Sequence, residues 1–101
     1  MDDHLPNGRV AAITHSSRLV LRRGVKLRRD PVRDRWVVLA PERILTPNEQ
    51  AAEVLRLCDG HRTVGEIASL LANTYDAEPD TIAADIMPVL ENLVDMGVLT
   101  A

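Results

Sequence analysis

The side chains best suited to metal binding or nucleophilic chemistry are three histidines and one cysteine: His4, His15, Cys58 and His61. Zinc and iron–sulfur sites bring several such ligands together at short, recurrent spacings. These four residues share no such spacing, so we expect no metal site. Cys58 closes a stretch in which apolar residues recur three and four positions apart, which indicates a small core residue rather than a reactive thiol.

The other chemistry that the sequence could carry is phosphate binding or acid–base catalysis. The five glycines form neither a dinucleotide-binding pattern nor a P-loop. His61 and the nearby hydroxyl residues form no recognisable triad order. No Asp or Glu falls on a clearly apolar face, where burial would raise the pKa of a general acid. We therefore expect a protein that is not an enzyme and that uses no cofactor.

The net charge of −3 conceals two halves of opposite sign. Residues 1–45 carry ten basic and five acidic side chains, whereas residues 46–101 carry two basic and ten acidic ones. A helix that reads DNA needs basic side chains, but residues 80–96 contain four acidic residues and no Lys or Arg. We expect no nucleic-acid binding. The basic residues around 28–35 then form either a solvated turn or a contact for an acidic partner: Arg28, Arg29, Arg33 and Arg35.

The length of 101 residues suits one domain, expected at 18–101 behind a flexible tail at 1–17. Alternation of side-chain type predicts a strand over 25–30, an apolar run predicts a second over 35–40, and a third short strand is expected over 42–46. The second strand is apolar on both faces. It is therefore expected to be a middle strand covered on both sides, or to keep one side for a partner.

Three helices are expected after the strands. Thr46 or Asn48 can cap the first helix, and Thr63 with Glu66 forms a capping box for the second. The third is expected over about 80–96. This order predicts a small α+β domain of winged helix-turn-helix-like type, in which a three-stranded antiparallel sheet is followed by three helices.

The third predicted helix carries an unusually wide apolar stripe. At 100° per residue its apolar positions cover roughly half of the circumference, whereas a helix that only faces a core needs about 100°. The small domain could wrap this helix deeply, or one margin of the stripe could line an exposed groove beside the last strand. An extended peptide would then pair with Arg43–Thr46 as an added strand. A homodimer through the same edge is the competing use of that strand.

The segment GVKLRRDPVRDRWVVLAPERIL, followed by RLCDGHRTVGEIA and by a last helix ending in GVL, resembles the PqqD family of pyrroloquinoline quinone (PQQ) biosynthesis. The resemblance covers about residues 24–99. It implies a cytoplasmic peptide chaperone that binds the ribosomal precursor peptide PqqA and presents it to the radical SAM enzyme PqqE. Similar domains in other systems that modify ribosomal peptides (RiPPs) are called RiPP recognition elements.

In such domains the peptide lies as an extra strand between the third strand and the third helix. Carried onto this sequence, the resemblance implies a peptide-binding site made of Arg43, Ile44, Leu45, Thr46, Ile82, Asp85, Ile86 and Val89. It also makes the enzyme a candidate partner for the basic hairpin. No apolar run approaches the roughly 20 residues of a membrane span, so we expect no membrane partner. A single cysteine fits a reducing cytoplasm.

Overall fold

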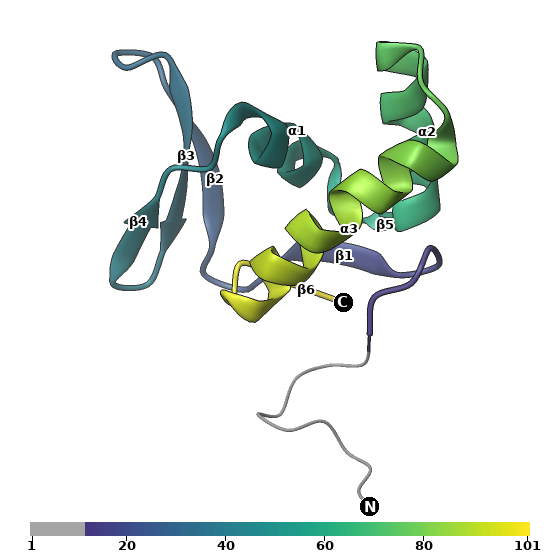
Figure 1. Cartoon of the computed structure of the whole chain (residues 1–101). Helices are drawn as coiled ribbons and strands as arrows, with labels where there is room; N and C mark the ends of the chain where they lie inside the picture. Colours follow the sequence, from purple (N-terminus) through teal and green to yellow (C-terminus); the bar gives the residue numbers. More distant parts are fainter. Residues whose placement is uncertain (1–11) are drawn as a thin grey trace, which may run out of the picture.

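The structure, a computed structural model, describes residues 12–101. Figure 1 shows β2, β3 and β4 on one side of the molecule, α2 on the other and α1 between them, while α3 runs from α2 toward the sheet. The bounds of the elements in chain order are β1 Arg18–Leu21, β2 Lys26–Asp30, β3 Arg35–Ala40, β4 Arg43–Leu45, α1 Glu49–Leu57, β5 Asp59–Thr63, α2 Val64–Tyr75, α3 Pro79–Asp95 and β6 Leu99–Thr100.

The strands form two antiparallel sheets of three strands each within the described residues. β2, β3 and β4 follow one another as the predicted meander, in which Val38 lies opposite both Leu27 and Leu45. The second sheet has the order β5–β1–β6 and joins distant parts of the chain, since Val20 pairs with Asp59 and with Thr100.

The predicted α+β class and the three helices are confirmed. The single sheet of the winged helix-turn-helix-like prediction is wrong, because β1 pairs with β5 and β6, which come after α1 and α3 in the chain.

β5 occupies a stretch between the first and second predicted helices, where the sequence predicted no strand. α1 ends at Leu57, and the chain then extends alongside β1. Gly60 has a φ of 83°, which lies in the region that favours glycine. A Cβ on Gly60 would lie 3.4 Å from the Val20 Cβ, so the missing side chain lets the two strands approach closely.

Side-chain caps fix where α1 and α2 begin. The Asn48 Oδ1 accepts a hydrogen bond from the Ala51 amide at 2.8 Å. At the start of α2, the Glu66 amide donates to the Thr63 Oγ1 at 3.1 Å and the Thr63 amide donates to the Glu66 Oε1 at 2.7 Å. The predicted capping box is therefore confirmed, and Asn48 caps α1.

The core joins the helices to both sheets. Its largest fully buried side chains come from β1, β3, all three helices and the C-terminal segment: Leu19, Val38, Val54, Val64, Ile67, Leu90, Val98 and Leu99. These core residues are all aliphatic. They recur with the 3.6-residue period of the helices and the two-residue period of the strands, so each element turns one face to the core.

The predicted tail falls partly outside the described residues, which begin at residue 12. The part that is described contacts the start of α2: the Gly65 amide donates to the His15 carbonyl and the Val64 amide to the Ser17 carbonyl, both at 2.9 Å. Ile13 packs against the core. Residues 13–17 are thus attached to the domain.

Candidate functional site

β4 is the outermost strand of the β2–β3–β4 sheet, and among the described residues it pairs with β3 alone. Alternate backbone N–H and C=O groups of such a strand point away from its partner. β4 contains only three residues, Arg43–Leu45, and lies between Pro41 and Pro47. Ile44 is 67% exposed and Thr46 is exposed. The predicted strand therefore has an open edge.

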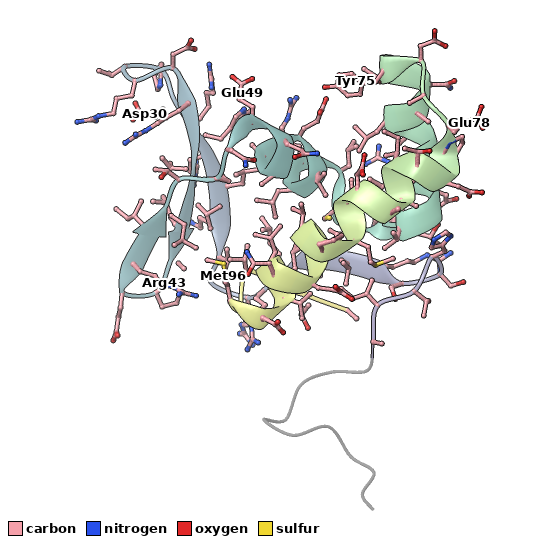
Figure 2. The ribbon with its side chains drawn as sticks, in the orientation of Figure 1. Asp30, Arg43, Glu49, Tyr75, Glu78 and Met96 are labelled. Atoms are coloured by element: carbon pink, nitrogen blue, oxygen red, sulfur yellow. The ribbon has the colours of Figure 1, made fainter. Side chains whose placement is uncertain are left out.

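Arg43 connects β4 to the end of α3. Its Nη2 donates a hydrogen bond to the Met96 carbonyl, and Figure 2 shows the two labelled residues close together at one end of the sheet. Ile82 precedes Met96 by fourteen residues, which corresponds to about 21 Å along a helix axis. The structure thus brings the start of β4 to the C-terminal end of α3, whereas Ile82 lies near the opposite end of that helix.

A cavity of about 600 Å³ lies between α1, α2, the N-terminal half of α3 and the sheet. Ile82, Asp85 and Ile86 of the predicted site line it, together with Val54 and Leu71. The other predicted residues of the peptide site lie elsewhere: Val89 packs partly buried against the core, and the four residues from 43 to 46 are not part of the lining.

The sheet side of the cavity is aromatic and basic. The Arg56 guanidinium carbon lies 5.0 Å from the Trp36 ring centroid, and that of Arg29 lies 5.7 Å from it. Both separations fall within the range of cation–π attraction. The two arginines therefore hold the Trp36 ring in place on this wall.

The cavity lining also contains acidic residues. The Tyr75 hydroxyl contacts both carboxylate oxygens of Glu53, at 2.6 and 2.8 Å, and this hydrogen bond raises the pKa of Tyr75. Asp85 and Glu49 also line the cavity, and Figure 2 shows Glu49 and Tyr75 at the same end of the molecule. A lining that combines apolar, basic and acidic side chains suits a peptide with apolar and charged side chains.

Sequence reasoning did not include Trp36, Arg56, Glu53 or Tyr75 in the site. The available signal was aromatic content, because Trp36 and Tyr75 are the two aromatic residues of the whole chain. Both lie on this cavity.

The four arginines predicted as a partner contact have different surroundings. Arg29 forms an ion pair within the hairpin, and an Arg33 Nη1 lies 3.7 Å from an Asp30 Oδ2. Arg35 faces Asp30 across the β2–β3 pair. Arg28 makes no ion pair with any described residue. Arg28 is therefore the member of this group whose charge is least engaged within the molecule.

Cys58 is buried, and desolvation, with a smaller contribution from Asp59, raises the pKa of its thiol to about 12. Because the thiolate is the reactive form, this cysteine is inert at neutral pH. Among residues 12–101, no three His, Cys, Asp or Glu side chains are arranged to hold a metal ion. None of the helices in this part of the chain is long and apolar enough to span a membrane.

Comparison with protein families identifies relatives over most of the chain. Residues 35–99 match the family described as coenzyme PQQ synthesis protein D (PqqD). A PqqA binding protein of Bradyrhizobium diazoefficiens is 46% identical over 88% of this chain and 86% of its own length. A bifunctional coenzyme PQQ synthesis protein C/D of Methylorubrum extorquens is 51% identical over 78% of this chain, which corresponds to 21% of that longer protein.

Solved structures with this fold include the PqqD part of Methylobacterium extorquens PqqCD, which is described as a stand-alone RiPP recognition element. It is 47% identical, has a TM-score of 0.77, and the match covers 89% of this chain and 96% of that one. A lasso peptide synthetase B1 in complex with its leader peptide shares the fold at 17% identity and a TM-score of 0.70 over 84% of this chain and all of the other. From the family match and the identity over most of its length, the chain belongs to the PqqD family.

Proposed function

We propose that this protein is a non-catalytic peptide chaperone of PQQ biosynthesis, which binds the precursor peptide PqqA and presents it to the radical SAM enzyme PqqE in the cytoplasm. Relatives that are 45–47% identical are named PqqA binding proteins. The PqqD part of Methylobacterium extorquens PqqCD is described as a functional recognition element for such peptides.

The observation that carries the proposal is the unpaired edge of β4, together with the cavity that Ile82, Asp85 and Ile86 of α3 line. An extended peptide pairs with β4 through main-chain hydrogen bonds, and these do not depend on its sequence. Its alternate side chains then point toward the core side of the sheet, where α3 lies. The site proposed for the peptide combines the edge Arg43–Thr46 with Ile82, Asp85, Ile86 and Val89 of α3.

Binding of this kind accelerates modification by position rather than by chemistry. A precursor held next to the enzyme is presented at a higher effective concentration than a free one. The protein then needs no catalytic residue of its own. The presentation step requires that the peptide and the enzyme bind at the same time.

The most direct test is a titration of ¹⁵N-labelled protein with synthetic PqqA, followed by amide NMR shifts. We expect the largest shifts at residues 43–46 and 82–89. Ile82→Ser is expected to weaken peptide binding by about tenfold or more, because it removes an apolar side chain of the groove. Leu70→Ser is the matched control, since Leu70 is an exposed leucine of α2 outside this site. Shifts confined to the 28–35 hairpin would contradict the proposed site.

A second test separates strand addition from other modes of binding. In an antiparallel or parallel added strand, only alternate peptide amides donate to β4. A PqqA peptide that is N-methylated at every second residue should therefore bind in one of the two methylation registers and fail in the other. Equal binding of both peptides would contradict strand pairing while leaving peptide binding itself intact.

A further inference from the structure

The β2–β3–β4 sheet has one face turned to the core and one turned away from all three helices. The core-side residues include Val38, which is 1% exposed. On the outer face, Leu39 is 36% exposed and Ile44 is 67% exposed. Figure 1 shows the three helices on the other side of this sheet. The pairing register gives the outer face as Lys26, Arg28, Asp30, Arg35, Val37, Leu39 and Ile44.

The centre of this outer face is apolar. Leu39 lies directly opposite Ile44 on one side and Lys26 on the other, and Val37 lies beside it on the same strand face. A sheet face that meets only water usually carries polar side chains at these positions. An apolar strip bordered by charged residues is typical of a surface that another protein covers.

The border of the strip is positively charged. Lys26 and Arg28 make no ion pair with any described residue. The one acidic residue of the face, Asp30, is engaged in the hairpin turn: its Oδ1 accepts hydrogen bonds from the Val32 and Arg33 amides at 3.1 and 3.3 Å. The free charge beside Leu39 is therefore basic, and the complementary partner surface is acidic.

We propose that this outer face is the surface on which the modifying enzyme docks, through a segment of the enzyme that has an apolar centre and an acidic border. The inference rests on the proposed function and adds to it a place for the enzyme that adjoins the peptide edge at Ile44 and otherwise uses other residues of the sheet. A peptide strand added to β4 would extend the same sheet beyond Ile44. Alternate side chains of the bound peptide would then project on the outer face, next to the docked enzyme.

A second copy of this chain fits the same surface less well. A symmetric dimer would place Lys26 and Arg28 of one protomer near those of the other, and like charges oppose such a contact. The acidic half of another copy could meet the basic strip in a head-to-tail contact, and contacts of that kind produce rings or open chains rather than a two-fold dimer. The charge pattern thus favours a different, acidic protein.

The test measures enzyme binding and peptide binding separately, by calorimetry with the purified radical SAM enzyme and with synthetic PqqA. Leu39→Asp and Arg28→Glu should each weaken enzyme binding by about tenfold or more, and should leave PqqA affinity within about twofold. Leu70→Asp on α2 is the matched control, since Leu70 is 43% exposed, and should leave both unchanged. Enzyme binding of the wild type should also weaken as salt rises.

Each other outcome has a distinct meaning. Unchanged enzyme binding in both outer-face variants would overturn the inference, as would an equal loss of peptide binding in variants that remain folded. Light scattering that shows a wild-type dimer broken by Leu39→Asp would assign the face to a second copy instead, and would also overturn it. If the wild type binds the enzyme through this face but does not bind PqqA, the docking surface stands and the proposed function fails.

Discussion

The two sheets of this molecule differ in how they are assembled and in what covers them. The β5–β1–β6 sheet joins segments from both ends of the described chain, and Leu19 and Leu99 within it are each 1% exposed. The β2–β3–β4 sheet is formed by consecutive strands and has two outer strands, β2 and β4, and one exposed face. The first sheet joins the two ends of the described chain, whereas the second is the one on which we propose that other molecules bind.

This difference teaches that stability and binding are largely separated in this domain. Residues of the first sheet pack in the core together with α2 and α3, so their loss leaves cavities. Residues at the edge of the second sheet contact mainly solvent, so their loss should affect partners more than folding. The predictions below test this separation.

The largest expected effect is on the free energy of unfolding. Leu99→Ala should lower it by about 2–5 kcal/mol, because a fully buried leucine leaves a cavity between β6, β1 and the helices. Ile44→Ala, at the exposed edge, should change it by no more than about 0.5 kcal/mol. Urea unfolding followed by circular dichroism measures both, and similar costs for the two variants would remove the distinction between the sheets.

A smaller effect is expected at the joint between β5 and α2. Thr63→Ala removes the side-chain cap of α2 and should cost about 1 kcal/mol of unfolding free energy. Thr46→Ala is the control, since this exposed threonine follows β4 and does not cap α1, whose cap is Asn48. A cost at residue 46 equal to that at residue 63 would show that the two regions contribute alike.

Acid should weaken the same joint. The Thr63 amide that bonds to Glu66 holds the pKa of this carboxyl below its usual value, and the Arg62 and His61 amides do the same for Asp59. Because the folded-state pKa values lie below the unfolded ones, these groups stabilise the fold above the unfolded pKa values of about 4. That contribution is lost as the pH falls through the folded-state values.

The measurement is the urea midpoint between pH 6 and pH 3. Glu66→Gln should reduce its dependence on pH, because the group that titrates is gone. Glu78→Gln is the matched control, since the Glu78 side chain makes no cap hydrogen bond at the start of α3. An unchanged pH dependence in Glu66→Gln would locate the acid sensitivity elsewhere.

The smallest effect concerns the contact between β4 and α3. Arg43→Ala removes the hydrogen bond to the Met96 carbonyl at an exposed position, and should lower the unfolding free energy by less than about 1 kcal/mol. Amide hydrogen exchange should nevertheless become faster in β4 while that of β1 and β5 is unchanged. Faster exchange in both sheets would indicate that they open together.

The features predicted correctly from the sequence are those set by near neighbours in the chain. The β2–β3–β4 meander follows from alternation and from two short turns, and the capping box of Thr63 and Glu66 needs a spacing of three residues. The second sheet was missed because β6 has two residues and its pairing with β1 spans most of the chain. No local pattern encodes such a pairing.

The candidate site was predicted in part for the same reason. The apolar stripe of α3 indicated a groove along this helix without choosing its margin, and the family resemblance named Ile82 and Ile86, which line the cavity. The place of Trp36 in the cavity lining depends on how α1 packs against β3. The hydrogen bond between Tyr75 and Glu53 joins α2 to α1. These are tertiary contacts, and a single sequence does not specify them.

The short length of β4 limits how much main-chain hydrogen bonding can contribute to the binding of a peptide strand. Pro47, two residues beyond the strand, has no N–H and ends the run of donors along this edge. A guest gains only a few ladder bonds there, each worth about 0.5–1.5 kcal/mol. Most of the selectivity for a peptide must then come from contacts of its side chains. The backbone of the peptide can leave β4 without any unfolding of the domain. Weak pairing of this kind suits a protein that releases its bound peptide quickly and can then bind another.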